Sequence, residues 1–335
     1  MKNNMLNEVA AELVAKGKGI LAADESGRTA DKRFEAVGIP KTEEMRRKWR
    51  ELLFTTPGIE EALSGVILFD ETIRQSSGGI TFPNLLAAKG IMPGIKVDKG
   101  TVDLTGSVGE KITEGLDGLE ERLAEYSKMG AKFAKWRAVI TIGENLPSKQ
   151  CLQTNADILS QYAIFCQEAG IVPMVEPEVL LDGTHTLERC EEVLVETLKT
   201  LFDTLPKYKV DLKGLILKSS MALPGKDSGQ KVSAKEIAEA TVRALKASVP
   251  KEVAGVVFLS GGQTSIQATE NLNEMAKIAD KPWPLTFSYS RALQEPVMKA
   301  WLGKDENVKA AQDIFRKRVL ATAAASEGRY DSTME

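Results

Sequence analysis

Short apolar runs recur along the chain, and each of them ends in polar or charged residues. The runs are rich in Val, Ile, Leu and Phe and are short, which is typical of buried parallel strands. Together with the polar residues at their ends, they cover residues 19–26, 64–71, 91–98, 131–139, 171–178, 215–221, 255–262 and 284–291. The pattern therefore predicts eight strands of similar construction.

Between these runs, apolar positions recur at helical spacing. Thr42 is expected to cap one helix, and Ser233 with Glu236 forms a capping box at the start of another. Further helices are expected over about residues 4–16, 187–201 and 307–325. Strands and helices thus alternate along the chain.

This alternation, with polar groups gathered at the strand ends, is typical of an α/β protein built as a (β/α)8 TIM barrel. We expect a single barrel domain over residues 1–335, with a short C-terminal tail from about residue 327. An open doubly wound sheet is the competing fold. That fold more often carries a glycine-rich dinucleotide fingerprint after its first strand, and residues 24–27 do not form one.

Charge and hydropathy exclude several classes of partner. The formal net charge of −3 argues against a general nucleic-acid-binding protein, which usually has a strongly basic balance. No apolar run approaches the roughly 20 residues that span a membrane, so no membrane association is expected. The N-terminus resembles neither a signal nor a transit peptide, and the three scattered cysteines suggest reduced thiols. We therefore expect a cytoplasmic protein.

The residues that usually bind zinc are few and dispersed. His185 is the single histidine, and the cysteines do not cluster with it at the short spacings of a zinc site. A magnesium site made of carboxylates alone stays open on this argument. We expect chemistry that needs no metal and no other cofactor.

Lys218 stands at the end of the apolar run 215–218. A lysine in this place either extends to solvent or serves as an amine. Desolvation and a second nearby cation favour the neutral amine, which attacks carbonyl groups. For Lys218 alone both interpretations stay open, and the rest of the chain favours the reactive one.

In a barrel, the strand ends meet around one pocket. The candidates there are Asp24, Lys96, Lys135, Arg137, Glu176, Glu178, Lys218, Ser260, Gly261, Gly262 and Arg291. Positive charge is in excess in this group, which favours a phosphorylated substrate. The backbone N–H groups of residues 260–262 and the guanidinium of Arg291 are suited to phosphate oxygens.

The same group contains the parts of an imine-forming site. Lys135 would be the second cation beside Lys218. Glu176 could move protons during dehydration of the carbinolamine that precedes a Schiff base, and Asp24 could accept a hydroxyl proton. For any single residue a structural ion pair is an equally good explanation, but the arrangement of the whole set by strand order favours catalysis.

The chain resembles the class I fructose-1,6-bisphosphate aldolases nearly from end to end. The resemblance lies in blocks that follow one another in order, at residues 19–26, 94–100, 115–119, 133–137, 170–173, 175–178, 259–263 and 285–289. Each block is modest in itself, and their order makes the match specific. The resemblance implies cleavage of fructose 1,6-bisphosphate to dihydroxyacetone phosphate and glyceraldehyde 3-phosphate, in a homotetramer that needs no metal.

The resemblance also implies a role for each matching residue. Lys218 would form the Schiff base, Glu176 would transfer protons with support from Lys135 and Glu178, and Asp24 would take the C4-hydroxyl proton. The C1-phosphate would be held by Arg33, Ser260, Gly261, Gly262, Ser288 and Arg291. Lys96 and Ser26 would lie toward the C6-phosphate, and Arg137 near the substrate.

Three departures from the family pattern carry expectations of their own. Residues 219–220 are Ser-Ser where the family commonly has proline followed by Asn or Ser, which could change how rigidly Lys218 is presented. Ser290 replaces a glycine and is expected to weaken or reshape the phosphate site. Residues 330–335 do not end in the tyrosine that usually terminates the family's mobile tail, so we expect slower turnover or altered preference between one- and two-phosphate substrates.

Two other functions remain as alternatives. One is a different Schiff-base enzyme, such as a transaldolase or another sugar-phosphate aldolase. Cationic clusters around both Lys96 and Arg291 favour a bisphosphate over the substrates of these enzymes. The other is a non-catalytic aldolase-like scaffold, and the presence of Asp24, Lys135, Glu176 and Lys218 together argues against it.

Overall fold

The computed structural model describes residues 2–335, which form a closed barrel of eight parallel strands. Around the barrel the order is β1-β12-β11-β10-β9-β8-β5-β2. The bounds are β1 Gly19–Ala23, β2 Leu63–Leu68, β5 Met92–Lys96, β8 Phe133–Ile140, β9 Val172–Val179, β10 Ile216–Ser219, β11 Gly255–Phe258 and β12 Leu285–Tyr289. Each strand lies within one of the predicted apolar runs or extends it by a residue, so the predicted barrel is confirmed.

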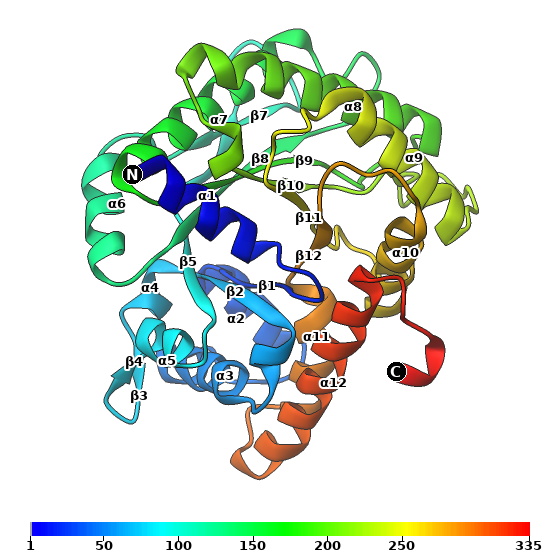
Figure 1. Ribbon diagram of the computed structural model, residues 1–335. Helices are drawn as coiled ribbons and strands as arrows, with labels where there is room; N and C mark the ends of the chain where they lie inside the picture. The colour runs from blue at the N-terminus through cyan, green and yellow to red at the C-terminus, as the bar shows by residue number, and fades with distance from the viewer. Residues whose placement is uncertain (1) are drawn as a thin grey trace.

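Helices other than α1 surround the barrel as an outer ring (Figure 1), and α1 precedes them in the chain. Their bounds are α1 Lys2–Leu13, α2 Gly27–Glu35, α3 Glu43–Thr55, α4 Asp70–Ile73, α5 Phe82–Ala88, α6 Leu119–Lys128, α7 Lys149–Ala169, α8 Leu187–Thr204, α9 Ala234–Ser248, α10 Ser265–Lys277, α11 Arg291–Trp301 and α12 Val308–Ser326. Two hairpins are added, β3 Ser76–Ser77 with β4 Ile80–Thr81 and β6 Gly100–Asp103 with β7 Lys111–Glu114. The ring buries the outward faces of the strands.

The predicted helix starts are confirmed in detail. The Thr42 hydroxyl accepts a hydrogen bond from the Met45 N–H at 3.1 Å, which caps α3. Both halves of the capping box between Ser233 and Glu236 are present at the start of α9. The first helix is shorter than expected at its C-terminal end, since α1 ends at Leu13 and the chain turns before Gly17, which has a φ of 72°.

Helix α1 lies across the barrel rather than in the ring (Figure 1). Its apolar residues and those that follow it pack against inward-facing residues of the strands. This cluster contains Leu6, Ala10, Leu13, Val14, Ile20, Ala22, Ile67, Phe133, Val172, Met174, Ile216 and Val257. Because strand starts such as Ile20, Val172 and Ile216 belong to it, α1 covers the N-terminal end of the barrel and leaves the carboxyl ends of the strands open.

Glycines make room for the largest side chain in this cluster. Gly94 on β5 is the register partner of Phe133 on β8. A Cβ built on Gly94 would overlap the Phe133 ring, and one on Gly65 would lie 3.0 Å from it. The Phe133 ring therefore fills the barrel interior only because two neighbouring strands carry glycine at its level.

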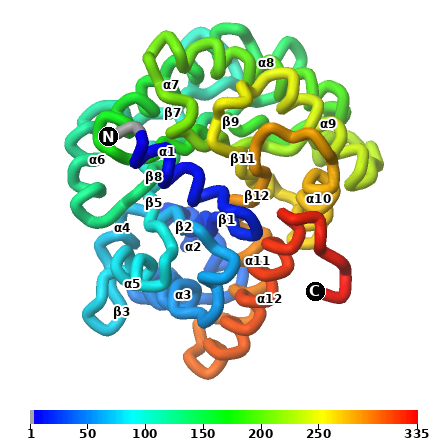
Figure 2. Tube along the Cα trace, in the orientation of Figure 1, coloured from blue at the N-terminus to red at the C-terminus, as the bar shows by residue number. Residues whose placement is uncertain are grey.

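The chain end lies beside α10 and α12 (Figure 2). The Tyr330 N–H donates to the Asn273 side chain at 3.0 Å, and the Tyr330 hydroxyl donates to the Glu335 carboxylate at 2.7 Å. Glu335 also pairs with the buried guanidinium of Arg318. Among the helices in residues 2–335, none is long and apolar enough to cross a membrane.

Candidate active site

A cavity of about 790 Å³ opens at the carboxyl ends of the strands. Most of the residues that the sequence predicts for the site line it: Asp24, Ser26, Arg33, Lys96, Lys135, Arg137, Glu176, Glu178, Lys218, Ser260, Gly261, Ser288 and Arg291. Gly262 lies just behind this lining, where a Cβ would be 3.8 Å from the Arg291 guanidinium. The barrel therefore brings together residues that lie far apart in the sequence.

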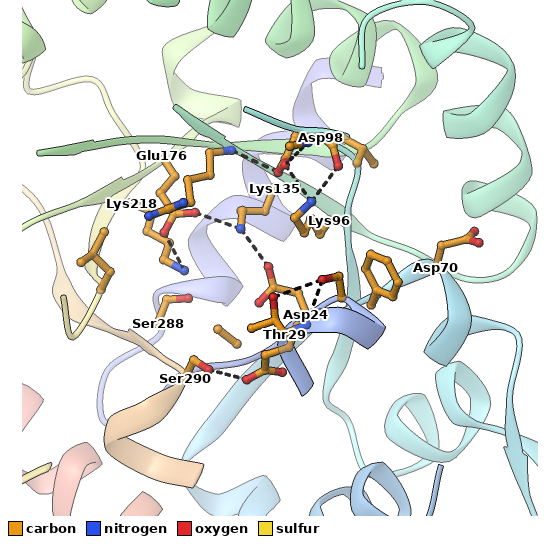
Figure 3. Close-up of a pocket in the computed structure, with 18 of the residues that line it drawn as sticks. Asp24, Thr29, Asp70, Lys96, Asp98, Lys135, Glu176, Lys218, Ser288 and Ser290 are labelled. Atoms are coloured by element: carbon orange, nitrogen blue, oxygen red, sulfur yellow. Dashed lines mark hydrogen bonds and ion pairs between the residues drawn. The ribbon is translucent and has the colours of Figure 1, made fainter. Parts of the chain in front are cut away.

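The carboxylate of Glu176 joins two lysines at the centre of the cavity floor (Figure 3). Its Oε1 atom lies 3.0 Å from Lys218 Nζ, and its Oε2 atom lies 3.1 Å from Lys135 Nζ. The three side chains project from β10, β9 and β8, which are neighbours in the barrel. Each of these side chains is no more than 5% exposed. The sequence predicts Lys135 as a cation beside Lys218 and as a support for Glu176, and in the structure the Glu176 carboxylate contacts both lysines.

Asp24, which follows β1, approaches the same group from the other side of the cavity. Its Oδ2 atom lies 2.8 Å from Lys135 Nζ, so Lys135 is held between the carboxylates of Asp24 and Glu176 (Figure 3). The second oxygen of Glu176 remains directed to Lys218. The four charged groups form one continuous chain across the cavity floor, from Asp24 to Lys218.

Burial and charge act in opposite directions on these groups. Burial raises the pKa of Asp24, but the ammonium groups of Lys135 and Lys218 outweigh it and hold the pKa well below its ordinary value. The pKa of Glu176 is likewise lowered, since Lys135 and Lys218 again exceed the effect of burial. Burial lowers the pKa of Lys135, yet the carboxylates of Asp24 and Glu176 raise it above its ordinary value. At neutral pH both carboxylates are therefore ionised and Lys135 is protonated.

Two further charged pairs stand beside this chain. Arg137 pairs with Glu178 across the β8–β9 ladder. Lys96 lies 2.7 Å from the Asp98 carboxylate and donates to the Asp98 backbone carbonyl, also at 2.7 Å. The sequence predicts Glu178 as a support for Glu176, and the structure gives it Arg137 as its partner. Asp98 was missed, although its alternate spacing from Lys96 is a signal for a shared face.

A third polar cluster surrounds Glu25, for which the sequence predicts no role. The Glu25 side chain is 5% exposed, and its carboxylate lies 2.6 Å from the Arg50 guanidinium and also pairs with Arg33. Ser290 donates to it at 2.6 Å, and Gln294 donates at 2.9 Å. Burial raises the pKa of Glu25, but the charges of Arg50 and Arg33 outweigh burial and lower it.

Hydroxyl and backbone groups line the side of the cavity formed by β11 and β12. Gly261 and Gly262 follow β11 with φ values of 53° and 87°, and the Gln263 N–H donates to the Ser260 carbonyl at 3.0 Å, which closes a tight turn beside the cavity. In the described part of the chain, the buried hydroxyl of Ser288 has no hydrogen-bond partner. Ser288 and Lys218 face one another in Figure 3. This side is therefore equipped to bind an anion with groups that are not already used.

The cavity extends beyond the predicted residues toward α4 and α6. This extension is lined by Thr29, Phe69, Asp70, Arg74, Lys99, Thr101, Arg122, Glu125 and Tyr126. Figure 3 shows Asp70 well apart from the lysines. Most of the charges here are paired, as Arg74 contacts both Asp70 and Glu125. Within residues 2–335, the structure has no group of three or more His, Cys, Asp or Glu side chains that could bind a metal ion.

Comparison with known proteins identifies the family. The family model for class I fructose-bisphosphate aldolase, a glycolytic enzyme family, matches residues 5–335. The chain belongs to this family. A probable class 1 fructose-bisphosphate aldolase from Xanthomonas campestris is 52% identical over 98% of this chain and 99% of its own length. The cytosolic fructose-bisphosphate aldolase 4 of Arabidopsis thaliana is 50% identical over 96% of this chain and 82% of its own.

A solved aldolase structure has the same fold. The structure of fructose-bisphosphate aldolase from Plasmodium falciparum, in complex with TRAP and a small-molecule inhibitor, matches with a TM-score of 0.98 and 43% identity. The match covers 99% of this chain and 96% of the Plasmodium chain. The family resemblance stated from the sequence blocks is thus confirmed in both sequence and fold.

Proposed function

We propose that this aldolase cleaves fructose 1,6-bisphosphate reversibly to dihydroxyacetone phosphate and glyceraldehyde 3-phosphate, through a Schiff base on Lys218. The observation that supports it most directly is the buried Lys218 ammonium, 3.0 Å from a Glu176 carboxylate in a cavity that cationic groups line. When a sugar carbonyl reaches Lys218, the carboxylate that accepts the lysine proton is already in contact with the lysine.

The first half of the reaction forms the imine. Lys218 transfers a proton to Glu176, and the neutral amine attacks the C2 carbonyl to give a carbinolamine. Glu176 then returns the proton to the C2 oxygen, which leaves as water, and a protonated imine remains. Lys135 stays charged throughout, because Asp24 and Glu176 both raise its pKa.

The second half breaks the C3–C4 bond. Asp24, which is ionised in the resting site, accepts the C4-hydroxyl proton, and the aldehyde of glyceraldehyde 3-phosphate forms as the bond breaks. The bonding electron pair moves into the protonated imine and gives an enamine on Lys218. Protonation at C3 and hydrolysis of the imine release dihydroxyacetone phosphate and restore the lysine.

Two groups of polar residues in the cavity would bind the two phosphates. Arg33, Ser260, Gly261, Gly262, Ser288 and Arg291, from the adjacent β1, β12 and β11 side, would bind the C1-phosphate. Lys96 and Ser26 would bind the C6-phosphate, and Arg137 would contact the substrate between them. This division supports a bisphosphate over the substrates of a transaldolase.

Borohydride trapping tests the proposal. The protein is incubated with dihydroxyacetone phosphate, reduced with sodium borohydride and digested, and the modified peptide is found by mass spectrometry. We expect one adduct, on Lys218, with the same yield when EDTA is present. Lys135 is an internal control, since it lies in the same cavity and is not expected to be modified.

A folded protein that gives no adduct would overturn the mechanism and favour the non-catalytic scaffold. An adduct on Lys218 without cleavage of fructose 1,6-bisphosphate would favour a different Schiff-base enzyme, which cleavage assays with sugar monophosphates would then identify.

The proposal extends to the state of the protein in the cell. We propose a cytoplasmic homotetramer of single barrel domains with a short tail from about residue 327, acting on sugar phosphates without a cofactor. The name of the cytosolic Arabidopsis relative supports the location. Light scattering of the purified protein should give a mass about four times the 36.5 kDa of the chain. A mass equal to one chain at micromolar concentration would contradict the tetramer.

A further inference from the structure

The hydroxyl of Ser290 connects the segment after β12 to the segment after β1. Ser290 Oγ donates to Glu25 Oε1 at 2.6 Å and accepts from Arg33 Nη1 at 3.1 Å. It also accepts from Gln294 Nε2 at 3.2 Å. Figure 3 shows Ser290 directed toward this carboxylate at the edge of the cavity. The hydroxyl thus lies at the meeting point of an arginine, a carboxylate and an amide.

The hydrogen-bonding capacity of this hydroxyl is fully used. A serine hydroxyl has one donor and two acceptor positions. Glu25 takes the donor, and Arg33 and Gln294 occupy the acceptors. Ser290 could donate to a bound phosphate only by releasing Glu25, whose buried charge depends on such donors. The arrangement therefore favours an action of Ser290 through Arg33 over direct contact with substrate.

Ser290 is also not a helix cap, although it occupies the N-cap position of α11. A serine in this position usually accepts from the N–H two or three residues later. Ser290 makes no such side-chain bond. Removal of its hydroxyl would therefore not uncap α11, and a substitution here tests the contacts of the hydroxyl with Arg33, Glu25 and Gln294.

Only one nitrogen of the Arg33 guanidinium makes hydrogen bonds within residues 2–335. Its Nη1 atom contacts Glu25 and Ser290. Among residues 2–335, the hydrogen bonds of this side chain all involve Nη1, and its Nε and Nη2 atoms make none. The side chain is 25% exposed and lines the cavity. Glu25 and Ser290 thus fix the position of the Arg33 guanidinium, and its remaining N–H donors are available to a ligand in the cavity.

We propose that Ser290 is a positioning residue for the phosphate at this end of the cavity. It fixes the Arg33 guanidinium against Glu25 before substrate arrives and does not itself touch the phosphate. This inference rests on the proposed function, because it assigns Ser290 to the binding of the C1-phosphate. The serine that the sequence comparison expects to weaken the site instead orders one of its arginines.

Ordering an arginine in advance favours binding more than the chemical step. A long side chain loses rotamer freedom when it binds an anion, and a fixed side chain has already lost it. Loss of one hydrogen bond of ordinary net strength should change affinity about three- to ten-fold. We therefore expect Ser290→Ala to raise KM for fructose 1,6-bisphosphate about three- to ten-fold and to leave kcat within about two-fold.

The experiment compares three variants with the wild type. Steady-state kinetics of Ser290→Ala, Ser290→Thr and Ser233→Ala give kcat and KM separately. The Thr variant keeps the hydroxyl and should restore KM. Ser233→Ala removes a real helix cap outside the cavity lining and should lower the melting temperature without changing KM. An unchanged KM in Ser290→Ala, or an equal rise in Ser290→Thr, would overturn the inference.

A double-mutant cycle separates action through Arg33 from direct contact. Binding of inorganic phosphate is measured by calorimetry in the wild type, Ser290→Ala, Arg33→Ala and the double variant. We expect the Ser290 substitution to weaken binding in the wild type and to have no further effect once Arg33 is absent. Additive losses would mean that Ser290 contacts the phosphate itself, and the positioning role would be wrong.

The calorimetric measurement needs no turnover, so it stands apart from the proposed function. If borohydride trapping fails while the Ser290 and Arg33 substitutions still show coupled phosphate binding, the mechanism is wrong and the positioning role holds. If trapping succeeds and the coupling is absent, the proposed function holds and Ser290 has no such role.

Discussion

The Nζ atom of Lys218 lies 3.0 Å from Oε1 of Glu176. The same carboxylate contacts Lys135 through its other oxygen, so a single group is in position to exchange protons with one lysine while a second lysine keeps it ionised. Lys218 and Lys135 therefore differ in their surroundings, although both are buried lysines in the same cavity. Lys218 has one carboxylate partner, whereas Lys135 has two.

Glu176→Gln should block proton exchange while preserving the shape of the side chain. We expect kcat to fall by about 10²- to 10⁴-fold, the range typical of a lost general acid–base group. Rapid-quench borohydride trapping should show slower formation of the Lys218 adduct. Glu125→Gln is the matched control, because Glu125 lines the same cavity but forms its ion pair with Arg74. An adduct that forms at the wild-type rate in Glu176→Gln would contradict this role.

Lys96→Ala should separate substrates with one and two phosphates. Lys96 lies at the end of β5, away from Arg33 and Arg291, so it would meet only the C6-phosphate. We expect kcat/KM for fructose 1,6-bisphosphate to fall about 10- to 100-fold, with a change of less than about three-fold for fructose 1-phosphate. Kinetics on the two sugars measure this difference. An equal loss on both would place Lys96 at the reacting centre.

Stability should fall in acid because three buried carboxylates have lowered pKa values. Groups of this kind stabilise the fold above their unfolded pKa, about 3.9–4.3, and lose that contribution as the pH falls through the lower folded pKa. The free energy of unfolding should therefore decrease below about pH 4–5, as Asp24, Glu25 and Glu176 are protonated. Lys135, with its raised pKa, adds stability below about pH 10.4 that is lost in strong alkali.

Glu25→Gln tests directly whether a buried carboxylate causes the loss of stability in acid. Removal of one partner from a buried ion pair costs about 3–5 kcal/mol at neutral pH, and this difference from the wild type should shrink as the pH approaches 3. Urea unfolding between pH 3 and 8 measures it. Glu295→Gln, at an exposed pair with Lys299, should leave the curve unchanged. A difference that stays constant with pH would mean that the Glu25 charge is not the cause.

Gly94→Ala should strain the barrel interior through Phe133. The added methyl group would overlap the ring, and overpacking of this kind costs about 1–3 kcal/mol. Phe133→Leu should also destabilise, on the order of 1 kcal/mol, because it leaves a void. The double variant should lose less than the sum of the two, by at least about 0.5 kcal/mol in urea unfolding. Gly27→Ala, whose Cβ would meet only ordinary contacts, is the control.

Local patterns predict most of the fold. A strand run and a helix cap depend on residues within a few positions of one another, and the Thr42 cap and the Ser233 capping box are both present. The polar residues at strand ends could also be assigned to one pocket, since parallel strands in a barrel share one active end. Asp24, Glu176 and Lys218 meet for this reason.

Contacts between segments that are distant in the sequence could not be predicted from local patterns. In the cluster around Glu25, Arg50 is 25 positions away in the sequence and Ser290 is 265 positions away. No periodic pattern connects Glu25 to either residue. The partner of Glu178 depends on the register of β8 with β9, which places Arg137 opposite Glu176 and two residues from the position opposite Glu178. Helix α1 was predicted as a helix, but its place across the barrel depends on the shape of the strand starts, which its own sequence does not contain.

The position of α1 has a kinetic consequence. With one end of the barrel covered, the cavity has its mouth at the carboxyl ends of the strands, and incoming sugar and outgoing trioses share that passage. Under the proposed mechanism, the triose freed by bond cleavage leaves first through this passage, and the one attached to Lys218 leaves after hydrolysis. A product that lingers in the passage obstructs the next substrate, so the rate at high turnover depends on clearance of the mouth as well as on the chemistry beneath it.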